Sequence, residues 1–223
     1  MCRENGESKM DSLLQLAALL HQYNAIGSQI AQIVGRPAQI GHVGEYIAAQ
    51  VFDIRLEHAA NAKGIDGYFR SGPLQGGSVN VKWYAKQENA LDIVEALLPD
   101  YYLVLAGPPS TMMTSRGGQR PWLIHSVFLF AAVPLLEELR RQGVKLGVAT
   151  SVRKAVWEAT MIYPQSHNPL YVLSDGQRRQ LALFEGMLSP EADGLPADLQ
   201  TALAQMAAIR SSTMKTAVSG SPY

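Results

Sequence analysis

Residues 64–84 read Gly-Ile-Asp-Gly-Tyr-Phe-Arg-Ser-Gly-Pro-Leu-Gln-Gly-Gly-Ser-Val-Asn-Val-Lys-Trp-Tyr, and this stretch decides the fold. Residues 78–84 alternate apolar and polar side chains, which is typical of a strand with two different faces. The aromatic-rich run 65–69 predicts a second strand, and the Gly- and Pro-rich residues between the two predict the turn of a β-hairpin. The alternation in 52–57 predicts a third strand just before the hairpin.

Helical and apolar patterns continue on both sides of the hairpin. Apolar spacing predicts one long helix over 11–34, or two helices joined near residue 27, and another helix over 41–52. After the hairpin we expect a helix over 88–98 that Pro99 ends, and the fully apolar run 101–106 predicts a buried strand. Farther on, the pattern indicates strands at 122–130 and 144–149 and helices at 134–142, 151–161, 175–188 and 197–209.

The order helix, three strands, helix, strand predicts an α/β fold with a mixed sheet. Helices are added at both ends of this core. The expected organisation is an N-terminal helical segment over 1–40, the α/β domain over 41–165, C-terminal helices over 166–210 and a flexible tail over 211–223.

The composition excludes several classes of protein. The 223 residues include 19 Lys and Arg against 19 Asp and Glu, and 47% are hydrophobic, so a disordered or collagen-like chain is excluded. Zero net charge gives no bulk attraction to nucleic acid, so such a site requires a local basic surface. Cys2 is the single cysteine, which excludes an internal disulfide and a Cys-rich zinc site. The longest apolar run, 127–136, is too short to span a bilayer, and we expect a soluble cytoplasmic protein without a membrane anchor.

Four polar residues in this core form a candidate site: Glu45, Asp66, Asn80 and Lys82. Strand alternation puts Asn80 and Lys82 on one face, and the hairpin brings Asp66 beside them. Two alanines, Ala48 and Ala49, let the preceding helix approach the sheet closely, which is expected to carry Glu45 to the same side.

Such a gathering of carboxylates favours a divalent cation. Two carboxylates about 4 Å apart repel by roughly 4 kcal/mol at an effective dielectric constant near 20, and bound Mg²⁺ or Mn²⁺ removes that cost. A lysine beside the metal stabilises the charge that develops on a phosphate. These parts suit the hydrolysis of phosphodiester bonds.

The arrangement of Glu45 on a helix, Gly64-Ile65-Asp66-Gly67 on a strand and Val79-Asn80-Val81-Lys82 on the next resembles the PD-(D/E)xK nuclease superfamily, which has the restriction-endonuclease-like fold. More narrowly, it resembles uncharacterised bacterial domains of that fold. The resemblance covers about residues 41–106. It implies that Glu45 and Asp66 bind Mg²⁺ or Mn²⁺, that Val81 contributes its carbonyl, and that Lys82 is catalytic. Asn80 stands where the family usually has Asp or Glu, and its amide oxygen binds a metal without contributing charge.

Several alternatives stay open at this point. Asp66 between two glycines is also typical of a turn, Lys82 of a solvated strand face, and Glu45 of the first turns of a helix. Asn80 and the zero net charge favour a catalytically inactive nucleic-acid- or protein-binding module on the same fold, in a defence or restriction assembly. A third reading is an interaction protein in which helices around 175–209 form an oligomer surface.

For the nuclease, DNA is the expected partner, and a homodimer or another protein partner is left open. The predicted phosphate contacts are Lys63, Lys86, Arg116 and Arg120, for each of which an isolated surface charge is the alternative.

Overall fold

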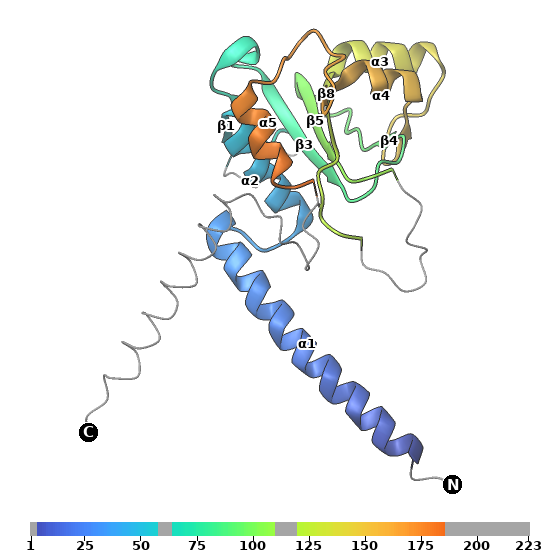
Figure 1. Cartoon of the computed structure of the whole chain (residues 1–223). Coiled ribbons are helices and arrows are strands. Elements are labelled where there is room, and N and C mark those ends of the chain that lie inside the picture. The colour runs from blue at the N-terminus through green and yellow to red at the C-terminus, as the bar shows by residue number, and fades with distance from the viewer. Residues whose placement is uncertain (1–3, 58–63, 110–119, 186–223) are drawn as a thin grey trace, which may run out of the picture. The chain divides into compact units, whose positions relative to one another are not determined.

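The computed structural model describes residues 4–57, 64–109 and 120–185, with side chains from residue 12 onward (Figure 1). The helices of these residues are α1 (Glu4–Val34), α2 (Ile40–Phe52), α3 (Ala132–Arg141), α4 (Lys154–Thr160) and α5 (Asp175–Ala182). The strands are β1 (Ile54–Leu56), β2 (Gly67–Phe69), β3 (Ser78–Tyr84), β4 (Ala90–Leu91), β5 (Tyr101–Ala106), β6 (Ser126–Ala131), β7 (Thr150–Ser151) and β8 (Met161–Tyr163).

The main sheet is mixed, as the sequence predicts. Its six strands follow the order β1-β2-β3-β5-β6-β8. Strand β3 runs antiparallel to β2 and parallel to β5, and the remaining neighbours in this sheet are antiparallel. The predicted hairpin is therefore confirmed, and β3 and β5 have the bounds that the sequence indicates. Strand β3 lies inside the sheet, with β2 on one side and β5 on the other.

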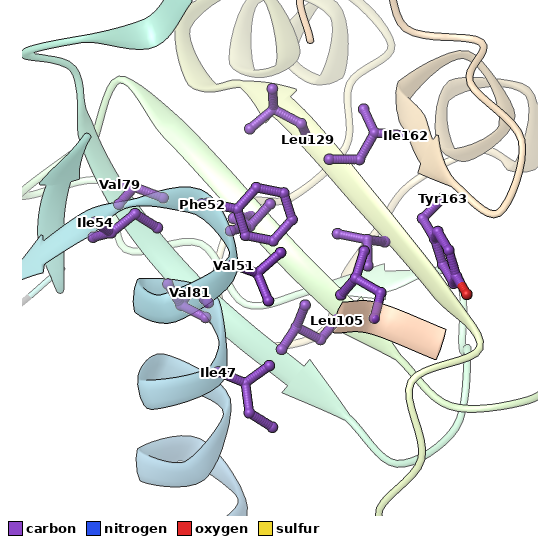
Figure 2. Packing of buried hydrophobic residues seen from close by; sticks show 14 of the residues in the cluster. Ile47, Val51, Phe52, Ile54, Val79, Val81, Leu105, Leu129, Ile162 and Tyr163 are labelled. Atoms are coloured by element: carbon purple, nitrogen blue, oxygen red, sulfur yellow. The ribbon is translucent and has the colours of Figure 1, made fainter. Parts of the chain in front are cut away.

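Helices cover both faces of this sheet. On one face, α2 and α5 enclose a core that includes Val79, Val81 and Trp83 of β3 together with residues of β5 and β6 (Figure 2). On the other face, residues of α3 and α4 pack on the alternate side chains of β5 and β6. The α/β class is thus confirmed, with Val79, Val81 and Trp83 of β3 on the α2 face and Tyr84 packed on the opposite one.

Helix α2 lies close to β3 because small residues face the strand. Ala48 is fully buried, as the sequence predicts. The tightest approach, however, is at Gly44, where an added Cβ would lie 3.0 Å from the Cβ of Trp83. Gly44 therefore fixes the height of α2 above the sheet directly beside Glu45, and the sequence analysis did not identify it.

The helix predicted over 88–98 is wrong. Residues 90–91 form β4, which pairs with β7 in a separate two-stranded sheet. Leu91 and Ile93 are both buried, which is the alternation of an extended chain. The Asp92 carboxylate accepts a hydrogen bond from the Ala149 N–H at 2.7 Å, so pairing with a distant segment overrides the local helical preference.

Other boundaries differ more mildly from the predictions. The segment 11–34 lies within one helix, α1, which is the first of the two alternatives. The strand predicted at 144–149 is wrong, because the strand there is β7 at 150–151. Within the helix predicted at 151–161 the structure has the shorter α4, and residue 161 already belongs to β8. The predicted helix at 197–209 and the tail at 211–223 lie outside the described residues.

Among the helices that the structure describes, none combines the length and the hydropathy needed to cross a bilayer.

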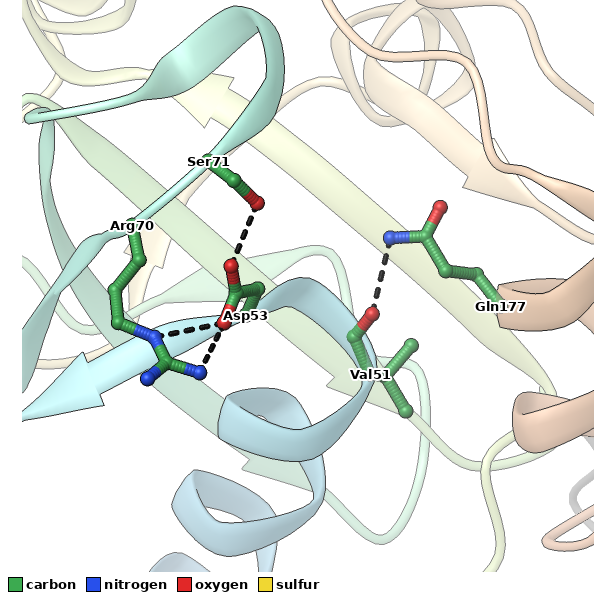
Figure 3. A network of polar contacts seen from close by, with 5 residues as sticks. All are labelled: Val51, Asp53, Arg70, Ser71 and Gln177. Carbon is green, nitrogen blue, oxygen red and sulfur yellow. Dashed lines mark hydrogen bonds and ion pairs between the residues drawn. The ribbon is translucent and has the colours of Figure 1, made fainter.

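Two sets of polar contacts tie the C-terminal end of α2 to the rest of the fold (Figure 3). Asp53, which ends α2 at a positive φ of 54°, accepts hydrogen bonds from the Arg70 guanidinium and, at 2.6 Å, from the Ser71 hydroxyl. The Ser71 hydrogen bond and the Arg70 guanidinium hold the pKa of Asp53 below its usual range. Asp53 thereby connects the end of α2 to the β2–β3 hairpin.

Gln177 joins α5 to α2. Its amide Nε2 donates to the Val51 carbonyl at 3.0 Å and to the Tyr171 hydroxyl at 2.8 Å. Its Oε1 accepts from the Ser174 N–H at 2.9 Å, completing a capping box at the start of α5. Residues 171–181 thus belong to the same core as α2.

Replacing Gln177 with alanine is expected to lower the free energy of unfolding by about 1–2 kcal/mol, because the cap and the Val51 contact are lost together. Urea denaturation of the full chain measures this. Gln180→Ala, at an exposed position of the same helix, is the matched control and is expected to leave stability unchanged. Equal stability of the two variants would contradict the assignment of Gln177 as the link.

Candidate functional site

Asp66 lies where β2 and β3 separate. The paired register of the two strands ends at Gly67 and Val79. Asp66 still donates its N–H to the Val79 carbonyl at 2.8 Å, and its Oδ2 accepts from the Val81 N–H at 2.7 Å. The carboxylate therefore replaces the backbone of β2 as the acceptor for β3 at this point. Gly64, at a φ of 101°, is the residue at which the chain turns away.

Val81 directs its backbone toward this carboxylate. In a strand, the N–H and the C=O of one residue point to the same neighbouring strand. Because the Val81 N–H meets Asp66, the Val81 carbonyl lies on the same side of β3. The backbone oxygen that the resemblance assigns to a metal thus lies at the edge where the strands separate.

Asn80 and Lys82 share the other face of β3, as the sequence predicts. Their neighbours Val81 and Trp83 pack under α2, and strand alternation turns Asn80 and Lys82 away from it. Asn80 is 5% exposed, and its Oδ1 has no hydrogen-bond partner among the residues that the structure describes. A buried amide oxygen without a donor costs free energy, which a bound water or ion would offset. Lys82 is half-buried.

Glu45 approaches from the α2 side. Helix α2 covers the face of β3 that carries Val81 and Trp83, so the prediction that Glu45 shares a side of the sheet with Lys82 is wrong. The two charges flank Asp66 from opposite faces at the separated edge. The Glu45 side chain is 16% exposed and forms an ion pair with Arg36.

The charges of this cluster act together on Asp66. Burial raises the pKa of the Asp66 carboxyl, and the neighbouring Glu45 carboxylate raises it further. The Val81 N–H, the Lys82 ammonium and the Arg36 guanidinium lower it, but the net direction is upward. Glu45 and Lys82 are therefore both within electrostatic reach of Asp66.

Arg36 is a member of this cluster that the sequence analysis missed. It follows Gly35, at the end of α1, and precedes Pro37, so it was interpreted only as part of a helix stop. In the structure its guanidinium binds the Glu45 carboxylate and lowers the pKa of Asp66. An arginine just before a break, nine residues ahead of the candidate acid, is the signal that could have identified it.

The donor set suits a hard divalent cation. Glu45 and Asp66 offer carboxylate oxygens and Val81 a carbonyl, and oxygen is the ligand that Mg²⁺ and Mn²⁺ prefer. Asn80, also predicted as a ligand, lies on the face of β3 that is turned away from α2 and Glu45. Within residues 4–57, 64–109 and 120–185, no group of three or more His, Cys, Asp or Glu could hold a metal. A cation here would depend on the Val81 carbonyl oxygen as well as on the two acids.

The predicted phosphate contacts divide into two pairs. Lys86 and Arg120 both bind the Glu88 carboxylate, at 3.2 and 3.5 Å, so each already has an acidic partner. Lys63 and Arg116 lie outside the described residues.

Comparison of the sequence with models of known protein families finds no match, and none of the curated proteins matches it either.

Proposed function

We propose that this chain is a metal-dependent nuclease that hydrolyses phosphodiester bonds in DNA, built on a PD-(D/E)xK, restriction-endonuclease-like fold. One observation carries the proposal: the half-buried Asp66 carboxylate takes the place of the β2 backbone as the hydrogen-bond acceptor for Val81 of β3, and the charges of Glu45 and Lys82 both act on it. Carboxyl groups whose pKa is raised by burial beside other charged side chains are frequent at functional sites.

Each residue of the cluster has a proposed role. Glu45 and Asp66 would hold Mg²⁺ or Mn²⁺, with the Val81 carbonyl as a neutral ligand. When bound, the metal supplies a Lewis acid and lowers the pKa of a coordinated water. Lys82 places a positive charge beside the phosphate and so stabilises the negative charge that develops on it in the transition state. The Val81 N–H keeps the Asp66 carboxylate in place.

Arg36 supports a second phosphate-directed role. Its guanidinium offers a fork of donors that matches a phosphate as well as a carboxylate. With Glu45 engaged by a metal, the Arg36 guanidinium would be free to contact a phosphate of the DNA backbone.

Calorimetric titration with Mn²⁺ tests the metal site without knowledge of the substrate. The wild-type chain is expected to bind Mn²⁺, and Asp66→Asn to bind it at least about tenfold more weakly, because a charged ligand is lost while the acceptor for Val81 is kept. Asp175→Asn, an exposed acid at the start of α5, is the matched control and should bind like the wild type. Equal binding by wild type and Asp66→Asn would exclude Asp66 as a ligand.

A specific observation favours a second function, a binding module without catalysis. Glu45 and Asp66 carry two negative charges, Arg36 and Lys82 carry two positive ones, and Asn80 is neutral, so the cluster is balanced without a metal. This module predicts no Mn²⁺ binding, together with DNA or protein binding that survives Asp66→Asn. DNA cleavage that requires Mn²⁺ would exclude it.

A further inference from the structure

Helix α1 carries an apolar seam that the rest of the described chain leaves exposed. Its members recur at alternating spacings of three and four residues and are Leu16, Leu19, Tyr23, Ile26, Ile30 and Ile33. Ile30 is partly buried, and the other five are 51–66% exposed. Leu13 and Leu20 flank the seam and are about as exposed. Most helices in proteins are stabilised by packing of their apolar face, so an uncovered seam is a cost to the free chain.

The spacing identifies the shape of the missing partner. Repeats of three and four residues average 3.5, which is the period of a narrow stripe that faces a single helix in a coiled coil. A helix that packs on a sheet has a broader apolar face, as α2 does. The seam is therefore suited to one parallel or antiparallel helix, over three heptads.

The charge pattern points to the same helix in another chain. From residue 12 to residue 34 the sequence contains no Asp, Glu, Lys or Arg. Coiled coils that select a different partner carry charges of opposite sign beside the seam. Here the flanking positions on one side of the seam are Gln15, Gln22 and Gln29. These side chains are neutral and can hydrogen-bond to glutamines of the second α1 helix. Two identical helices meet without repulsion, and no charge favours a foreign partner.

The exposed area is large enough for a stable pair. Burying the seam with Leu13 and Leu20 would remove from water an area on the order of the ~800 Å² that each partner buries in a standard interface. We propose that α1 pairs with α1 of a second copy and makes the protein a homodimer. This pairing is independent of the metal site and stands whether or not the chain cleaves DNA.

Sedimentation velocity of the full chain across micromolar concentrations tests the dimer. The wild type is expected to sediment with a molecular mass twice the 24.3 kDa of one chain. Leu16→Glu combined with Leu19→Glu places charges in the seam of both copies and is expected to weaken dimerisation at least about 100-fold. Because both side chains are exposed in the single chain, the melting temperature of the monomeric domain should not fall.

The matched control puts the same two charges on the opposite side of α1. Asn24→Glu with Gln32→Glu, both exposed, is expected to dimerise like the wild type. A wild type that is monomeric throughout, or seam and control variants that dimerise equally, would overturn the proposal. A monomer that binds neutral phosphatidylcholine vesicles would instead assign the seam to a lipid surface.

Discussion

Replacing Lys82 with alanine is expected to lower the rate of metal-dependent DNA cleavage by about 10²- to 10⁴-fold. The charge of the Lys82 ammonium acts on the half-buried Asp66 carboxylate at the point where β2 and β3 separate. Removing it leaves Val81 and Trp83, which carry the packing of β3 under α2, unchanged. The loss should therefore appear in the catalytic rate, with Mn²⁺ binding retained and the melting temperature close to that of the wild type.

The measurement is the rate of plasmid nicking at saturating Mn²⁺. Lys154→Ala is the matched control, since Lys154 is 78% exposed on α4 and pairs only locally with Glu158. Lys82→Arg distinguishes the contribution of charge to the cleavage rate from that of side-chain shape, because it keeps the positive charge on a larger head group. Cleavage by Lys82→Ala at the wild-type rate would remove Lys82 from the proposed mechanism.

Asp66→Asn is expected to stabilise the fold at neutral pH while it abolishes function. The pKa of Asp66 is raised in the folded protein, so ionisation of this carboxyl costs folding free energy even with Lys82 and Arg36 nearby. Asparagine carries no charge and still accepts the Val81 hydrogen bond through its amide oxygen. Asp66→Ala leaves that N–H without its acceptor and is expected to lower stability by about 1–3 kcal/mol.

The pH dependence gives this prediction a definite sign. Below the ordinary Asp pKa of about 4, the carboxyl is protonated in both folded and unfolded chains, and Asp66→Asn should match the wild type. As pH rises from there through the raised folded pKa, the wild type loses stability and the variant does not. Thermal unfolding of the metal-free chain across this range measures the difference.

Asp53→Asn is the matched control with the opposite sign. Its pKa is lowered by Ser71 and Arg70, so its ionised form stabilises the fold, and the substitution should destabilise the protein at neutral pH. That deficit should shrink as pH falls through the lowered pKa. The same sign for both variants would contradict the raised pKa of Asp66.

The sequence predicts the hairpin and the β5 strand because these segments carry their information locally. The alternation in 78–84 and the apolar run 101–106 each define a strand without reference to any other part of the chain. The helix predicted over 88–98 fails because Leu91 and Ile93 are buried by pairing with residues some 60 positions away. Strand pairing over that distance leaves no local pattern.

The arrangement of the candidate site could likewise be predicted only where it depends on local pattern. Strand alternation correctly relates Asn80 to Lys82, and the turn correctly brings Asp66 to their strand. The side from which Glu45 arrives depends on which face α2 covers, and Gly44 and Trp83 decide that through a contact between different elements. Arg36 joins the cluster only because the chain breaks after α1, so its role follows from the fold and not from a motif.

The two edges of the main sheet have a consequence for how copies of the chain meet in concentrated solution. Strands β1 and β8 end the sheet, and each has only three residues. On β1, Arg55 is 67% exposed and pairs with Glu57. A short edge strand is a poor template for strand addition, and the charge of Arg55 adds to this on β1, so we expect folded molecules to resist extending one another's sheets into fibrils.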